Sequence, residues 1–385
     1  MKTLFLFSLF ILLIGCKEST QKLSTNIPTY KINLDKAEEL SIYDIFSEVN
    51  IVPLQTPDSI VCSGIHAYIY KNNGFFWDQR QHIVLNFDTL GNYRYKIDSK
   101  GRGANEYTSI LNISIDRFND RILILSYYSI LQYDLNGKFI QKIQYPENLV
   151  VHSATMVNKD ILLCVTTTAN NNQSYILNYL SIKKKKLIAS HYKEDPIFPV
   201  NRDISYYNKN LFYCISKSPI VYNVTYLEPQ PAYQWDLGKY NYDYRDLSIP
   251  KFKNRQEMQK NQVPWIYKHC PWFFYTTQEN LQYIYACFTL FANTNYLKEK
   301  APEYHVFWNK KTGSPKIVKK FKESDRIFHG GSSWTDEAIY CAVEKSMIPQ
   351  FIDLKALTPE NQKIIEELPE DCNPVLLKYI FKKDE

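Results

Sequence analysis

The chain has 385 residues and a formal net charge of +6, and it is 45% hydrophobic and 15% aromatic. This composition excludes a disordered or low-complexity protein, because such chains have too few apolar residues to bury a core. The 31 tyrosines and 21 phenylalanines favour strands over helices, since aromatic side chains fit the half-buried surface of a β-sheet.

The N-terminus has the pattern of a secretory signal. Lys2 precedes an apolar run, residues 4–14, that ends in Gly15 and Cys16. The run is too short to cross a bilayer as a permanent helix. Its ending resembles the lipobox of bacterial lipoproteins; an ordinary buried helix is the alternative. We expect residues 1–15 to be a cleaved signal peptide, Cys16 to carry a lipid, and residues 16–29 to form a flexible tether.

A lipid on Cys16 predicts attachment to the outer membrane of a Gram-negative envelope. Lys17 and Glu18, which follow it, do not decide between the periplasmic and the cell-surface side. Nucleic acid is not an expected partner. The basic residues are spread along the chain instead of forming a stripe with stacking aromatics.

The cysteines do not predict a disulfide scaffold or a metal site. Apart from Cys16 there are seven, an odd number. Cys164, Cys214, Cys287 and Cys341 lie in apolar, strand-like runs, where a thiol packs as a small hydrophobe. The chain has no CxxC or HxH pair, and its seven histidines are scattered. We therefore predict no metal site and no cofactor.

An internal repeat predicts the fold. Residues 83–93 recur as residues 130–139, each as two strands joined by an Asp-x-x-Gly turn, and Asp88 and Asp134 lie 46 residues apart. Such a period, with about four short strands per unit, is typical of a β-propeller blade. Weaker copies follow at 175–189, 220–237 and 304–321, and residues 327–381 supply a sixth unit. The sequence thus predicts a six-bladed β-propeller over residues 30–385.

The two ends of the chain predict how the ring closes. Residues 50–54 and 374–381 have strand patterns outside the regular count, and pairing them in one blade would protect both edges. Residues 246–262 and 358–367 interrupt the β pattern as predicted helices, the second with Thr358 before Pro359 at its start. The predicted fold class is an all-β propeller closed by its N- and C-terminal strands, with short helical insertions.

Four segments carry a family resemblance: residues 52–56, the repeated Phe-Asp or Tyr-Asp turn, residues 101–107, and residues 373–376. Together they resemble the six-bladed β-propeller lipoproteins of Bacteroidetes, an uncharacterised family distantly similar to NHL-repeat propellers. In the third segment Ala104 and Asn105 replace the Pro-Gly of the family pattern and leave Glu106 and Tyr107 in place. The resemblance implies a fold and an envelope location, and no reaction.

Propeller topology sends long connections to one face, which we call the loop-rich face. The second-to-third-strand loops and the connections between blades emerge there, whereas the Asp-x-x-Gly turns emerge on the opposite face, the turn face. Six of the nine arginines lie in loop-rich-face segments, while Arg94, Arg117 and Arg121 do not. Long insertions gathered on one rim are where scaffolds usually carry function. The predicted loops are 78–82, 98–109, 166–174, 191–203, 238–270, 288–303 and 322–334.

Six residues are candidates for ligand binding: Arg80, Arg102, Glu106, Tyr107, Arg202 and Arg326. A guanidinium suits carboxylate, phosphate or sulfate, although each arginine could equally form surface ion pairs. Glu106 and Tyr107 could orient a ligand beside Arg102. Alternatively they complete a tight crossover between blades, with Tyr107 filling the gap and Glu106 bonding loop amides.

No linear motif predicts a reaction, so no catalytic residue is assigned and enzyme activity is left open. We expect a non-catalytic, lipid-anchored module that binds an anionic glycan, a peptide or an envelope protein. The alternative is a propeller hydrolase or lyase acting on glycan or peptide in the envelope. A metal cage, or a pocket carboxylate or histidine with a shifted pKa, would favour the enzyme.

Overall fold

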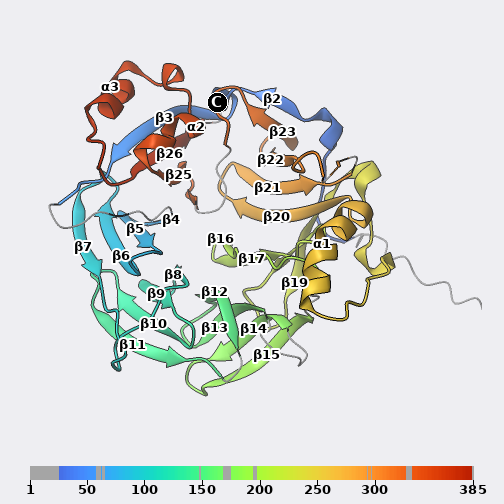
Figure 1. The fold of residues 1–385 in the computed structure, drawn as a ribbon, viewed down its shortest axis with the longest axis horizontal. Helices are drawn as coiled ribbons and strands as arrows, with labels where there is room; N and C mark the ends of the chain where they lie inside the picture. The colour runs from blue at the N-terminus through green and yellow to red at the C-terminus, as the bar shows by residue number, and fades with distance from the viewer. Residues whose placement is uncertain are drawn as a thin grey trace, which may run out of the picture.

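The computed structural model describes residues 26–57, 62, 66–146, 149–167, 175–193, 197–292, 294–295, 297–326 and 332–383. Its strands form six small sheets arranged around a central axis (Figure 1). The predicted six-bladed propeller is therefore confirmed. The predicted signal peptide, the lipidated Cys16 and most of the tether lie outside the described residues.

Each blade is an antiparallel meander whose first strand lies next to the axis. Blade 1 contains β4 (His66–Tyr70), β5 (Asn73–Asp78), β6 (Ile83–Asp88) and β7 (Tyr93–Ile97). Blade 2 contains β8 (Asn112–Asp116), β9 (Arg121–Leu125), β10 (Ser129–Asp134) and β11 (Phe139–Gln144). Blade 3 contains β12 (Val150–Met156), β13 (Ile161–Thr167), β14 (Tyr175–Ser181) and β15 (Lys186–Lys193).

The last three blades follow the same plan and also take strands from the N-terminus. Blade 4 contains β16 (Ser205–Tyr207), β17 (Asn210–Cys214), β18 (Ile220–Asn223) and β19 (Gln230–Asp236). Blade 5 contains β20 (Trp272–Glu279), β21 (Tyr283–Leu290), β22 (Glu303–Asn309) and β23 (Ser314–Phe321). Blade 6 contains β24 (Ser333–Trp334), β25 (Ala338–Val343) and β26 (Val375–Phe381).

The repeated turns join the third and fourth strands of their blades, as predicted. In the first, the Asp88 carboxylate accepts hydrogen bonds from the backbone N–H groups of Leu90 and Asn92, both at 2.9 Å. Gly91 has a φ of +88°, a conformation that glycine adopts without strain. The middle strands are apolar almost throughout, because neighbouring blades bury both of their faces.

A segment before the repeats runs along the outer edges of three successive blades. β1 (Thr29–Lys31) pairs in parallel with β19, and β2 (Glu38–Leu40) pairs in parallel with β23. β3 (Phe46–Pro53) then pairs antiparallel with β26. This N-terminal strap was predicted only over its last strand, since three-residue strands have too few residues to show a period. The 3₁₀ helices η1 (Leu34–Lys36) and η2 (Ile42–Asp44) separate its strands.

The pairing of β3 with β26 confirms the predicted closure of the ring. Its register places Val49 opposite Tyr379 and Asn50 opposite Lys378. Phe46 is fully buried, and its ring centroid lies 5.2 Å from that of Phe381. The closing strand is thus held by the backbone ladder and by core packing together.

The outer edge of β3 is covered by α3 (Pro359–Glu367), as Figure 1 shows. The Asn361 side chain accepts a hydrogen bond from the Ile51 N–H at 3.0 Å and donates one to the Val49 carbonyl at 3.1 Å. Asn361 is buried, so its amide takes the place of a neighbouring strand and blocks edge-to-edge association. Thr358 caps this helix as predicted, and its side chain accepts a hydrogen bond from the Asn361 N–H.

The other helical prediction was partly wrong. α1 (Arg255–His269) begins later than expected, capped by the Asn254 side chain, which accepts a bond from the Glu257 N–H. Pro250 disfavours helix at the residue before it, so the segment between η4 (Tyr244–Asp246) and α1 is extended. None of the helices in the described ranges has the length and apolar character needed to cross a membrane. The remaining helices are η3 (Gly238–Tyr240), η5 (Lys345–Met347), α2 (Ile348–Phe351) and η6 (Leu354–Ala356).

Candidate functional site

The inner strands of all six blades surround a cavity of about 390 Å³ on the propeller axis. This volume falls within the range of small-molecule sites. Tyrosine, tryptophan and aliphatic side chains alternate with polar ones around its wall. The polar lining includes Gln79, Asn112, His152, Arg202, Asp203 and Gln278.

Arg202 and Asp203 lie directly before β16, at the loop-rich end of the cavity. The Ser153 hydroxyl of blade 3 donates a hydrogen bond to the Arg202 carbonyl at 2.5 Å, which fixes this backbone. Burial raises the pKa of the Asp203 carboxyl, although Thr276 and the Arg202 guanidinium act in the opposite direction. Asp203 also has accessible surface, so the tunnel wall encloses it while it still faces the open cavity.

A chain of polar contacts links blades 1, 2 and 3 along the cavity wall. The Tyr68 hydroxyl donates to the Asn112 side-chain oxygen at 2.9 Å, and the Asn112 amide donates to the His152 carbonyl at 3.3 Å. His66 stacks on Trp77 with 5.2 Å between ring centroids, and burial lowers the pKa of His66. The cavity therefore offers a neutral imidazole, which can both donate and accept a hydrogen bond.

Arg117 narrows the cavity at the turn-face end. Its guanidinium lies 5.0 Å from the ring centroid of Tyr70 in blade 1 and 4.7 Å from that of Tyr206 in blade 4. Blades 1 and 4 are opposite in a six-membered ring, so this side chain reaches across the axis. Within the described part of the chain, no carboxylate forms an ion pair with it. Selecting arginines by face missed Arg117, because its turn belongs to the other face.

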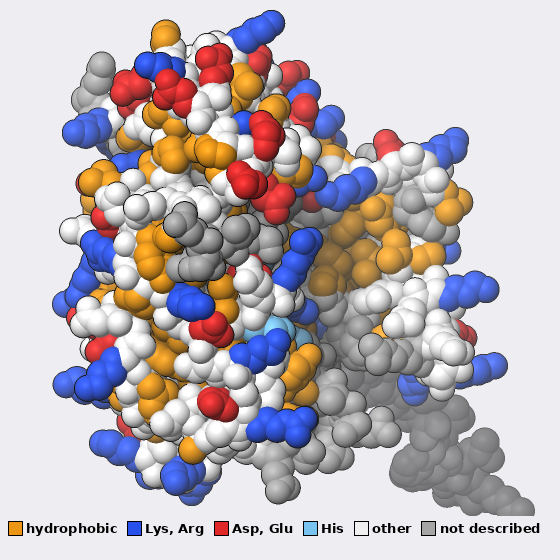
Figure 2. All heavy atoms as spheres, turned by 60° about the vertical axis from the view of Figure 1, so that its left-hand side comes forward, with side chains coloured by type: hydrophobic (Ala, Val, Ile, Leu, Met, Phe, Trp, Pro, Cys, Tyr) orange, Lys and Arg blue, Asp and Glu red, His pale blue; other side chains and the backbone are white. Residues whose placement is uncertain are grey.

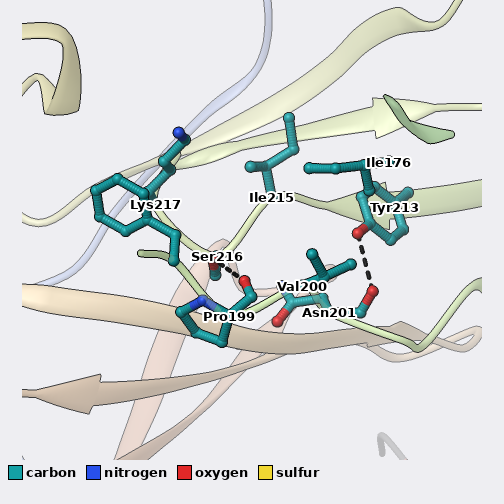
Figure 3. A pocket seen from close by; sticks show the side chains of 9 residues that line it. Ile176, Pro199, Val200, Asn201, Tyr213, Ile215, Ser216 and Lys217 are labelled. Carbon is teal, nitrogen blue, oxygen red and sulfur yellow. Dashed lines mark hydrogen bonds between the residues drawn. The ribbon is translucent and has the colours of Figure 1, made fainter. Parts of the chain in front are cut away.

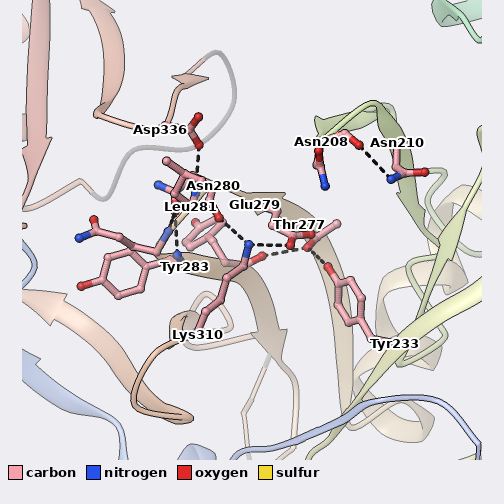
Figure 4. Close-up of polar contacts among 12 residues, drawn as sticks. Asn208, Asn210, Tyr233, Thr277, Glu279, Asn280, Leu281, Tyr283, Lys310 and Asp336 are labelled. Carbon is pink, nitrogen blue, oxygen red and sulfur yellow. Dashed lines mark hydrogen bonds and ion pairs between the residues drawn. The ribbon is translucent and has the colours of Figure 1, made fainter. Parts of the chain in front are cut away.

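Polar contacts join blades 4, 5 and 6 near the same end (Figure 4). Lys310 pairs with Glu279 at 2.7 Å and lies 3.9 Å from the ring centroid of Tyr207. The Tyr233 and Thr277 hydroxyls are hydrogen-bonded at 2.9 Å. These contacts, like Arg117, connect blades and give the cavity a fixed floor.

Of the four predicted arginines, the structure brings only Arg202 to the cavity. Arg80, Arg102 and Arg326 are exposed on the loop-rich face, and none of these three is part of the cavity lining. Their loops were placed correctly, but the direction of each side chain has no signature in the sequence.

Glu106 and Tyr107 make contacts within the crossover between blades 1 and 2. The Glu106 carboxylate accepts a hydrogen bond from the Gly103 N–H at 2.7 Å, and a Cβ on Gly101 would lie 1.9 Å from a Glu106 oxygen. Tyr107 is buried, and its hydroxyl donates to the His82 carbonyl at 2.9 Å. Both side chains thus contact the connection itself.

A second, smaller void lies beneath the connection that enters blade 4 (Figure 3). It holds about 10 Å³, space for no more than one water molecule. The Tyr213 hydroxyl donates to the Asn201 carbonyl at 2.8 Å, and the Ser216 hydroxyl donates to the Pro199 carbonyl at 2.6 Å. These bonds account for the void as local packing, and the axial cavity is the candidate site.

The outer surface has mixed charge. Figure 2 shows basic and acidic side chains interspersed over the visible face, with acidic side chains frequent at the top. The exposed Glu360, Glu366 and Glu367 of α3 contribute to this upper region.

Two solved structures from Bacteroides resemble the chain in fold. A predicted exported protein of Bacteroides fragilis is 15% identical, with a TM-score of 0.68 over 93% of this chain and 100% of that chain. A DUF4221-family member from Bacteroides vulgatus is 10% identical, with a TM-score of 0.52 over 88% of this chain and 97% of the other. Identities this low bear on the fold alone.

No curated protein matches the sequence. The model of a family described as a domain of unknown function, DUF4934, matches residues 25–379. That match covers almost the whole propeller and includes the four segments that carried the resemblance. The chain therefore belongs to the DUF4934 family.

Proposed function

We propose that the chain is a lipid-anchored envelope protein that binds a small anionic or polar ligand in its axial cavity without transforming it. The observation that carries the proposal is the cavity wall, where Arg202 and Asp203 at one end and Arg117 at the other enclose hydrogen-bonding side chains. Arginine recognises carboxylate and phosphate groups in planar, two-point geometry. An acidic sugar or a short acidic peptide fits this chemistry, and Arg80, Arg102 and Arg326 would attract it from the rim.

The membrane attachment rests on Cys16 and the signal before it. Expression with a labelled fatty acid should give a labelled mature protein in the membrane fraction, and Cys16→Ser should abolish both the label and the membrane association, since the thiol is the acylation point. Cys372→Ser is the matched control, because Cys372 lies near the other end of the chain. Label retained by Cys16→Ser would contradict the anchor.

Ligand binding is tested by a thermal-shift screen of the full-length protein in detergent against acidic saccharides and acidic peptides. A ligand that binds only the folded state raises the melting temperature, by about 2.7 kcal/mol of stabilisation at a hundredfold excess over Kd. We expect Arg202→Ala and Arg117→Ala to abolish the shift.

The matched controls are Arg80→Ala and Arg102→Ala, which remove rim arginines outside the cavity lining. They should weaken the shift only slightly, because an exposed charge at this distance is screened by salt. A shift lost in the rim variants and kept in Arg202→Ala would place the ligand on the outer loops. No shift with any compound would turn the search to a protein partner.

A hydrolase or lyase is the second candidate function, and Asp203 is the observation that favours it. A carboxyl with a raised pKa, inside a pocket and near neutral imidazoles, is the kind of group that acts as a general acid. Incubation of any bound saccharide or peptide with the protein, followed by mass spectrometry, distinguishes the two functions. Cleavage that disappears in Asp203→Asn would establish the enzyme.

The Asp203 carboxyl itself gives a pH prediction. Asp203→Asn should raise the melting temperature at about pH 7 and change it little at about pH 4, near the ordinary pKa of aspartate. A raised pKa means that the folded state holds the proton more tightly than the unfolded state, so stability falls as pH rises through that pKa. The neutral amide avoids this loss.

Melting temperatures of both proteins across this pH range measure the effect. Asp246→Asn, at an exposed position, is the control and should show no such trend. A wild-type-to-variant difference that stays constant with pH would show that the Asp203 charge carries no folding cost.

A further inference from the structure

Blade 5 holds a cluster of metal-ligating side chains that no sequence spacing indicated. Within the described residues, Cys287, Glu303 and His305 each offer one ligand atom, and these atoms lie within 4.8 Å of one another. Cys287 and His305 are buried and Glu303 is partly exposed. We propose that these three side chains bind one zinc ion.

The strand register explains why the three side chains meet. Cys287 on β21 is directly opposite His305 on β22. Glu303 is two residues before His305, so both point to the same face of the sheet. Three donors on two paired strands form a preorganised group, because the backbone ladder fixes their relative positions.

The donor set selects zinc over other common metals. One thiolate, one imidazole and one carboxylate combine soft and borderline ligands, whereas magnesium and calcium prefer oxygen alone. Zinc takes these atoms at about 2.0–2.3 Å, so small side-chain movements would bring them into contact with one ion. Three protein ligands leave a fourth position for water or an incoming group, as in catalytic zinc sites.

Tyr285 joins the cluster to the axial cavity. Its hydroxyl is 2.7 Å from Nδ1 of His305, and the same side chain lines the cavity. Histidines that bind metals commonly bond a second group through the other ring nitrogen, which fixes the ring. Tyr275 lies close enough to Asp203, Glu303 and Cys287 for all three to affect its pKa. The zinc would therefore lie beside the loop-rich end of the cavity.

Two competing interactions set the conditions for binding. Burial raises the pKa of the Cys287 thiol, so a metal must displace its proton, and affinity should increase with pH. Glu303 also pairs with Lys300 at 2.9 Å, but Lys300 is highly exposed and such surface pairs contribute little. The metal can therefore displace that lysine.

Cobalt(II) titration of the full-length protein tests the site without any cavity ligand. Bound cobalt should give a thiolate charge-transfer absorption and the strong visible bands of tetrahedral coordination, saturating at one equivalent and reversed by zinc. Cys287→Ala should abolish the charge-transfer absorption, and His305→Gln should abolish saturable binding. Tyr285→Phe should weaken zinc affinity by about 10–100-fold, because it removes the outer partner of the histidine.

Cys164→Ala is the matched control, since Cys164 is an equally buried thiol in blade 3, and it should leave the cobalt spectrum unchanged. Melting of the metal-free variants checks that each one folds, and zinc should raise the melting temperature of the wild type alone among wild type, Cys287→Ala and His305→Gln. Absence of the thiolate absorption in the wild type, or its persistence in folded Cys287→Ala, would overturn the proposal. Failure of the ligand screen would not affect this result, because no cavity ligand is present.

Discussion

The antiparallel pairing of β3 with β26 is the interaction on which the rest of the molecule depends. It joins segments more than 300 residues apart in sequence, and it completes the only blade built from both ends of the chain. The entropy needed to close so long a loop grows only slowly with its length, so a seven-residue ladder and a buried aromatic cluster can offset it. Asn361 then covers the backbone groups that β3 would otherwise expose.

A closed ring brings six inner strands to one axis, and this is how the cavity acquires groups that are distant in sequence. Each strand contributes a few polar side chains, and hydrogen bonds between blades hold them in place, as Tyr68, Asn112 and Ser153 do. The charge of Asp203 is costly in this setting, which is the condition expected of a residue retained for binding or chemistry. The propeller therefore supplies rigidity, and the cavity residues supply specificity.

The sequence predicted those parts of the fold that local patterns encode. The Asp88 and Asp134 turns repeat because the chain reverses in the same way in each blade, and their spacing reveals the blade period. Terminal strands outside the repeat predicted the closure. α1 was placed too early because polar composition outweighed Pro250, and the parallel strands β1 and β2 are too short to show any period.

The site was less predictable, because it depends on side-chain direction and strand register. Arg202 was selected with three rim arginines that the structure leaves outside the cavity, and Arg117 was missed on the opposite face. Asp203 is next to Arg202 in the sequence, yet only the closed ring makes its burial visible. Cys287 and His305 are 18 residues apart, and no motif relates them; only the β21–β22 register places them opposite each other.

Cross-linking of the closing strands is the most direct test of this architecture. Cysteines at Asn50 and Lys378, which are opposite each other in the register, should form a disulfide on mild oxidation, detectable as one cross-linked peptide by mass spectrometry. The oxidised protein should melt at a higher temperature than the reduced one, because the bond restricts the unfolded chain. Cysteines at Glu48 and Lys378, one pleat out of register, should cross-link far less. Equal cross-linking of both pairs, or of neither, would contradict closure of the ring in this register.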